Sequence, residues 1–126
     1  MKEITREWIN RAEEDYTIAL RESKTEPVIY NAVCFHSQQA AEKYLKALLQ
    51  ELDIEFEKTH DLVFLYEKIK GRLTGLSDKA ELLNELSLYA VETRYPGLSA
   101  EKEDAETAIK TMIMVREEVK KSLNTI

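Results

Sequence analysis

Apolar residues recur at every third or fourth position along most of this chain, which is the spacing of one face of an α-helix. No segment shows the strict apolar–polar alternation that is typical of a β-strand, and no internal repeat is present. Three glycines and two prolines interrupt the pattern and divide it into helical segments. The pattern therefore predicts an all-α protein.

The first two predicted helices lie close together in the sequence. The first runs from Ile4 to Glu22 and the second from about Val28 to Leu52, with Pro27 suited to the first turn of the second helix. Small residues on the apolar face of the second helix allow another helix to approach closely. We therefore expect the second helix to lie at the centre of the fold.

The third helix is expected from Leu62 to about Lys70. Asp61 or Thr59 suits its N-cap, because their side-chain oxygens can accept hydrogen bonds from free backbone N–H groups. Gly71 is placed to end this helix in a left-handed conformation.

Two more helices are predicted near the end of the chain. Ser77 is the expected N-cap of the fourth helix, and Pro96 ends it because proline disfavours helical backbone at the residue before it. Ser99 is the expected N-cap of the fifth helix, which covers about residues 100–123. Together the pattern predicts one domain, residues 1–126, folded as an antiparallel up-and-down helical bundle of four long helices plus one short helix.

Charge and composition narrow the class of protein. The formal net charge of −6 argues against sequence-independent binding to a nucleic acid backbone, although a small local RNA site stays open. The single cysteine, Cys34, excludes an intramolecular disulfide and suits a reducing compartment. We find no signal peptide and no run of 18 apolar residues, so a cytoplasmic protein that does not span a membrane is expected.

Several motifs occur in a fixed order along the chain: EWINRAEEDY, FHSQQAAEKYLKALL, THDL and ETRYPG. In this order and spacing the chain resembles the HEPN domain family from Trp8 to about Val119. The resemblance implies a bundle of four or five helices, commonly a homodimer. It also implies a genomic neighbour that is a minimal nucleotidyltransferase, in a two-component or toxin–antitoxin system.

Many HEPN domains are metal-independent ribonucleases with an arginine four to six residues before a histidine. This chain has two histidines, His36 and His60, and neither has an arginine at that spacing. After Arg94 the corresponding positions hold Ser99, Ala100 and Glu101. We therefore assign no catalytic residue and expect a non-catalytic protein.

The candidate nucleotide- or partner-binding residues are His36, Gln39, Lys43, Arg94 and Tyr95. His36 and Gln39 share a helix face, where they either satisfy polar groups between helices or at a dimer seam, or line a polar pocket with Arg94. Arg94 and Tyr95 either end a helix or bind phosphate. Lys43 is a candidate phosphate contact, although such lysines are usually solvated.

Other reactive residue types are interpreted structurally. Cys34, Tyr44 and Tyr89 are expected in the core, and one cysteine with two scattered histidines does not predict a zinc site. The acidic run from Glu13 to Asp15 could hold a metal, but a solvated helix face explains it better. The chain holds no phosphate-binding glycine motif, and we expect no metal and no cofactor.

Three hypotheses follow from the sequence. The first is a homodimeric, non-catalytic partner of a minimal nucleotidyltransferase that helps to bind its substrate or nucleotide. The second is a ribonuclease toxin with a variant site containing Arg94 and His36. The third is a binder of a small nucleotide such as ATP or GTP.

Overall fold

The computed structural model describes residues 1–91, 96–97 and 99–125. These residues form five α-helices, with three short 3-10 turns between them. The α-helices are α1 (Glu3–Glu22), α2 (Tyr30–Glu51), α3 (Leu62–Glu67), α4 (Ala80–Ser87) and α5 (Lys102–Leu123), and the 3-10 turns are η1 (Lys70–Arg72), η2 (Thr74–Leu76) and η3 (Leu88–Ala90). This confirms the predicted all-α bundle.

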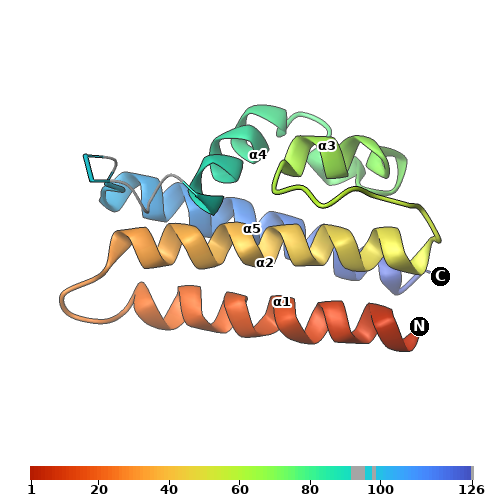
Figure 1. The fold of residues 1–126 in the computed structure, drawn as a ribbon, viewed down its shortest axis with the longest axis horizontal. Helices are drawn as coiled ribbons and strands as arrows, with labels where there is room; N and C mark the ends of the chain where they lie inside the picture. Colours follow the sequence, from red (N-terminus) through yellow and green to blue (C-terminus); the bar gives the residue numbers. More distant parts are fainter. Residues whose placement is uncertain (92–95, 98, 126) are drawn as a thin grey trace.

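Three long helices lie side by side, and two short helices cover one side of them (Figure 1). Helix α2 makes the most extensive contacts, with α1 on one side and α5 on the other. Helices α1 and α5 approach each other less closely and are joined by side chains, so α2 is the central helix that the sequence predicts. Both chain ends lie at the same end of the bundle (Figure 1).

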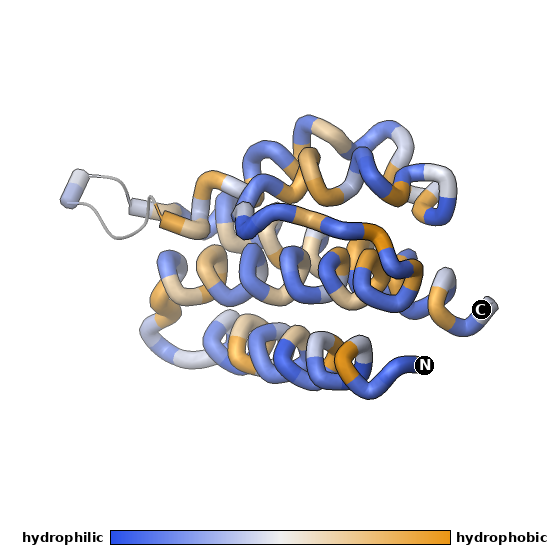
Figure 2. Tube along the Cα trace, turned by 45° about the vertical axis from the view of Figure 1, so that its right-hand side comes forward, coloured by the Kyte–Doolittle hydropathy of each residue, from blue (hydrophilic) through white to orange (hydrophobic). Residues whose placement is uncertain are grey.

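The hydrophobic core surrounds α2. Apolar segments gather in the interior in Figure 2, and hydrophilic segments lie along the outside. Ala40, Ala41 and Ala47 have no exposed surface, as expected where neighbouring helices approach closely. The largest apolar side chains of the core come from every α-helix except α1, and they include Leu45, Leu48, Leu49, Leu65, Leu83 and Met112.

Two predicted helix starts lie elsewhere in the structure. Helix α5 begins after Glu101, whose side chain and that of Asp104 form a reciprocal capping box, so Ser99 is not its cap. Helix α4 begins after Lys79, and Ser77 precedes it at the end of η2. In both cases the predicted serine stands two residues before the observed N-cap position.

The region around α3 and α4 is also wound differently from the prediction. Asp61 is the N-cap of α3, and it accepts hydrogen bonds from the N–H groups of Val63 and Phe64. Gly71 is not left-handed, because the chain continues into the 3-10 turn η1. Helix α4 has eight residues and tightens into η3 after Ser87, whose hydroxyl donates to the Leu83 carbonyl. The bundle therefore has three long helices and two short ones.

The link between α1 and α2 is longer than expected. Helix α2 begins at Tyr30, so Pro27 lies before the helix, where its bond to Glu26 is cis. The carboxylate of Glu22 accepts a hydrogen bond from the backbone N–H of Ile29 and another from the Thr25 hydroxyl. These bonds fix the turn. None of the helices in the described part of the chain is long and apolar enough to span a membrane.

Candidate functional site

Asp15 is a buried carboxylate that joins α1 to the middle of α2. It lies on the covered face of α1 between Ala12 and Ala19, with 7% of its surface exposed. Its Oδ1 is 2.8 Å from Nδ1 of His36, and its Oδ2 is 2.6 Å from Nζ of Lys43. A carboxylate is stable at such a depth only with partners of this kind, so the three side chains form one unit.

The contact with Asp15 fixes the chemistry of the His36 ring. An ionised carboxylate can only accept a hydrogen bond, so Nδ1 of His36 carries a proton. In the neutral ring, Nε2 is then the acceptor. About a quarter of the His36 side chain is exposed, and the same is true of Lys43. Both groups are therefore held in position and open to a binding partner.

Glu42 forms a second buried centre on α2. Its Oε1 accepts hydrogen bonds from Nε2 of Gln38 at 3.1 Å and from Nδ1 of His60 at 2.8 Å. Its Oε2 is 2.8 Å from Nζ of Lys46. Burial raises the pKa of Glu42, but the hydrogen bonds from Lys46, His60 and Gln38 outweigh it, so the pKa lies below its ordinary value.

Lys46 is buried among aromatic rings. Its ammonium group lies 5.7 Å from the ring centre of Trp8 and 5.9 Å from that of Phe56, and the two rings meet edge to face. Only 7% of Lys46 is exposed, so this lysine is not solvated as most lysines on a helix are. The ring faces and Glu42 together compensate the loss of water around this charge.

Gln38 explains why α2 carries amide groups in its core-facing half. The side chain is fully buried, and its Nε2 donates both to Glu42 and to the backbone carbonyl of His60. Its Oε1 accepts from Nε2 of Gln39 at 2.7 Å. The amides of α2 thus hold the connection that follows the helix, which supports the structural interpretation of Gln39.

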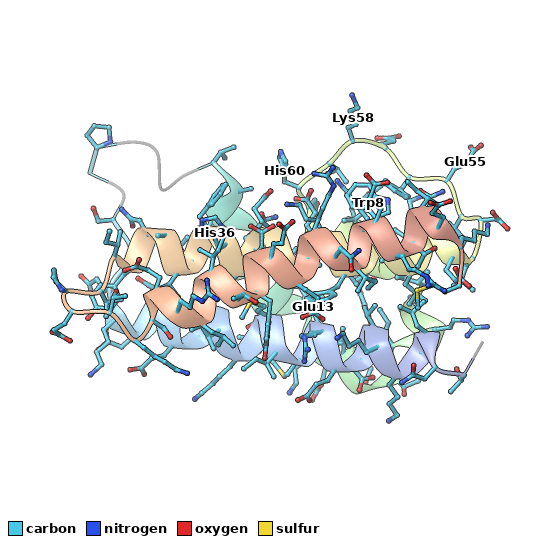
Figure 3. All side chains as sticks on the ribbon, turned by 90° about the horizontal axis from the view of Figure 1, so that it is seen from below. Trp8, Glu13, His36, Glu55, Lys58 and His60 are labelled. Atoms are coloured by element: carbon cyan, nitrogen blue, oxygen red, sulfur yellow. The ribbon has the colours of Figure 1, made fainter. Side chains whose placement is uncertain are left out.

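The connection from residue 55 to residue 60 is held mainly by side chains. Among the described residues no backbone–backbone hydrogen bond involves this stretch outside regular elements. Phe56 lies against Trp8 and Lys46, and His60 binds Glu42 and Gln38. Figure 3 shows His36, His60 and Trp8 along one edge of α1, with Lys58 at the outer bend of the connection.

A separate ionic cluster joins α1 to α5 on the other edge of α1, where Figure 3 shows Glu13. Glu13 binds Nε of Arg116 at 3.2 Å and also binds Lys120, and the Arg116 guanidinium lies 4.3 Å from the Tyr16 ring centre. Burial raises the pKa of Glu13, but the hydrogen bonds from Lys120 and Arg116 outweigh it and lower this pKa. Of the acidic run, only Glu14 is exposed, so the solvated interpretation fails for Asp15.

The structure brings together some of the predicted site residues. His36 and Lys43 meet at Asp15, whereas Gln39 belongs to the neighbouring Glu42 centre. Arg94 and Tyr95 lie outside the described residues. Sequence reasoning missed Asp15, Glu42, Lys46 and His60 as site residues. The signal for Asp15 was its position on the apolar stripe of α1, three residues after Ala12 and four before Ala19.

The core predictions for the reactive residues are confirmed. Cys34 and Tyr44 are fully buried, and Tyr89 packs against the core. Burial raises the pKa of Cys34 to about 12, so its thiol stays protonated and unreactive near neutral pH. Among the described residues no three histidine, cysteine or acidic side chains are grouped as metal ligands.

Comparison with known proteins identifies the family. The HEPN domain model matches residues 5–122, and the chain therefore belongs to the HEPN family. The crystal structure of TT1696 from Thermus thermophilus is similar with a TM-score of 0.79 and 23% identity, over 94% of this chain and 97% of that one. ST0689, an archaeal HEPN homologue, gives a TM-score of 0.70 and 28% identity, over 95% and 97%. No curated protein matches this chain.

Proposed function

We propose that this HEPN protein is a non-catalytic, homodimeric and cytoplasmic partner of a minimal nucleotidyltransferase, in a two-component or toxin–antitoxin system. Its binding surface lies around His36 and Lys43, and a small nucleotide is a further ligand of this surface. Arg94 and Tyr95 belong to the proposed surface on the strength of the sequence alone.

The observation that carries this proposal is the shared use of Asp15 by His36 and Lys43. Asp15 fixes both side chains without using all their hydrogen-bonding atoms, since a lysine has three N–H donors and the imidazole ring still has Nε2. Lys43 can donate to a carboxylate or phosphate, and Nε2 of His36 can accept from a hydroxyl or N–H group, so this preformed pair suits a ligand that carries both kinds of group, with little ordering cost. The chain also lacks an arginine at the ribonuclease spacing, which supports a role in binding rather than in catalysis.

Co-purification tests the partner. A tagged chain is isolated from its native cell, and bound proteins are identified by mass spectrometry. We expect a small nucleotidyltransferase in near-equal amount, and we expect the double variant H36A/K43A to lose it. Lys110→Ala, at an exposed position of α5, is the matched control and should retain it. Recovery of the chain without any nucleotidyltransferase would contradict the proposal.

Nucleotide binding is tested separately by thermal unfolding. Millimolar ATP or GTP should raise the melting temperature, since a ligand well above its dissociation constant adds roughly 1–3 kcal/mol to the free energy of unfolding. Arg94→Ala and Lys43→Ala should each reduce the shift. The absence of any shift at millimolar nucleotide would remove the nucleotide from the proposal.

The ribonuclease alternative has one observation in its favour, the contact between Asp15 and His36. A carboxylate that holds Nδ1 of a histidine leaves Nε2 as a general base, as in other carboxylate–histidine pairs. This alternative predicts RNA cleavage without added metal, and loss of cleavage in both His36→Ala and Arg94→Ala. Intact RNA after long incubation with excess protein would exclude it.

A further inference from the structure

A row of buried polar side chains runs along one face of α2. Gln38, Glu42 and Lys46 stand four residues apart, so they follow one line on the helix, and 0%, 4% and 7% of their surface is exposed. Their side chains bond to one another, because the Glu42 carboxylate accepts from Gln38 and from Lys46. A buried polar face of this kind needs further partners from whatever segment packs on it.

The connection between α2 and α3 contacts each member of this row. The ring of Phe56 faces the Lys46 ammonium group. His60 donates from Nδ1 to Glu42, and its backbone carbonyl accepts from Gln38. The connection therefore runs antiparallel to α2. The row is about 12 Å long at about 1.5 Å per residue, and an extended chain from Phe56 to His60 reaches about 13 Å, so the two lengths match.

The connection is held in the way that a bound peptide is held. Among the described residues, the stretch 55–60 makes no backbone–backbone hydrogen bond outside regular elements. Its anchors are the side chains of Phe56 and His60 and one carbonyl, whereas Glu57 and Lys58 between the anchors are exposed. A hollow of about 500 Å³ borders Phe56 at the start of the connection. The connection can therefore leave without breaking any helix.

Trp8 adds a hydrogen-bond donor that the connection does not use. Its side chain lies between α1 and the connection (Figure 3), and its ring meets that of Phe56 edge to face with the ring centres 6.4 Å apart. The indole Nε1 is buried and has no hydrogen-bond partner among the described residues. A buried N–H group without a partner is costly, so a segment that offers it an acceptor would bind better here than the connection does.

We propose that α1 and α2 form a peptide-binding surface that the chain's own connection occupies, and that the connection opens to admit a partner's segment of the same chemistry. That segment is extended. It carries an aromatic residue for Trp8 and Lys46, and a histidine or another basic residue four positions later for Glu42. Its backbone supplies a carbonyl for Gln38. This surface goes beyond the proposed function, and it needs neither the nucleotidyltransferase nor a nucleotide.

Hydrogen exchange of the Trp8 indole N–H measures the opening in the wild-type protein. The chain has one tryptophan, so NMR shows one indole signal. Its protection should be at least about tenfold lower than that of the backbone N–H of Leu45, in the core of α2, because the connection opens while the helices stay folded. Phe56→Ala should speed the indole exchange at least about fivefold and leave Leu45 unchanged. Equal protection of the indole and Leu45 in wild type would overturn the proposal.

A peptide added in trans tests the occupant. The probe is the peptide of residues 53–62, DIEFEKTHDL, which holds no tryptophan, so Trp8 fluorescence reports its binding. It is titrated to about 10 mM into the double variant F56A/H60A, since the wild-type connection competes at an effective concentration in the millimolar range. We expect saturable binding to the double variant, and binding at least about tenfold weaker to wild type.

Two altered peptides test the anchors. Phe56→Ala in the peptide should remove the binding, and so should His60→Glu, because the buried Glu42 carboxylate repels a second carboxylate. Circular dichroism verifies that the double variant keeps its helices, and the indole exchange of wild type tests the proposal without that variant. If the folded double variant does not bind the parent peptide, the proposal is overturned, and equal binding of all three peptides overturns it as well.

Discussion

Two clusters, each a glutamate bound by two basic side chains, lie on opposite edges of α1, and one is more deeply buried than the other. Glu42 on the α2 side and Glu13 on the α5 side each bind two basic side chains, and in each the pKa is lowered by those hydrogen bonds. The side chain of Glu42 is 6% exposed, and that of Glu13 is 29% exposed. Water can replace a lost partner of Glu13, but it cannot easily reach Glu42. The comparison teaches that depth, and not the number of contacts, decides what such a cluster contributes.

The largest expected effect is that of Lys46→Met. The change leaves the buried carboxylate of Glu42 without its cation, and removing one partner of a buried pair costs about 3–5 kcal/mol. Denaturant unfolding followed by circular dichroism measures the loss. The double variant E42L/K46M should recover most of it, because no unpaired charge remains. A loss of less than about 1 kcal/mol in the free energy of unfolding of the single variant would mean that the pair of Glu42 and Lys46 behaves like a surface ion pair.

A smaller effect is expected for His60→Ala. The ring donates to Glu42, but more than half of the His60 side chain is exposed, so we expect a loss of about 1 kcal/mol. Limited proteolysis should cut faster within residues 55–60, with little change in the hydrogen exchange of α5. His60→Asn is the matched control, because its amide can also donate a hydrogen bond to Glu42. Equal acceleration in α5 would mean that His60 supports the whole bundle.

Arg116→Ala should cost less, below about 1 kcal/mol, because solvent reaches the Glu13 cluster. Its effect should shrink in high salt, whereas that of Lys46→Met should persist, since buried pairs are poorly screened. Unfolding at about 0.1 M and about 1 M NaCl separates the two cases. A salt-independent loss at Arg116 would point to its packing on Tyr16 instead.

The smallest expected effect is the pH dependence of stability that Glu42 contributes. The folded pKa of Glu42 lies below its ordinary value of 4.5, so its ionisation stabilises the fold above that value. This contribution is lost as the pH falls through the lower folded pKa. The difference in stability between wild type and Glu42→Gln should therefore be constant near neutral pH and shrink below about pH 4.5. A difference that grows as the pH falls would mean that folding raises the pKa of Glu42 instead of lowering it.

Some of the fold could be predicted because it depends on local spacing. The stripes of α1 and α5 and the N-cap at Asp61 follow from neighbouring residues alone. The starts of α4 and α5 could not be read in the same way. Several serine and acidic residues near each start are suitable caps, and in the structure the reciprocal capping box of Glu101 and Asp104 marks the start of α5.

The candidate site was only half predictable for the same reason. His36 and Lys43 stand out on an apolar helix, but Asp15 lies on another helix, so only the folded chain shows that it holds both. Lys46 and Glu42 look like an ordinary exposed pair four residues apart. Their burial follows from the placement of Trp8 and Phe56, which the spacing of α2 does not encode.

The two-point attachment of the connection between α2 and α3 offers a practical opening. Phe56 and His60 are its anchors, and Glu57 and Lys58 between them are exposed. Figure 3 shows Lys58 at the outer bend. A reporter peptide or fluorophore inserted between Glu57 and Lys58 would leave both anchors and the helices in place. Such a probe would signal from beside His60 whenever another molecule arrives at this edge of the bundle.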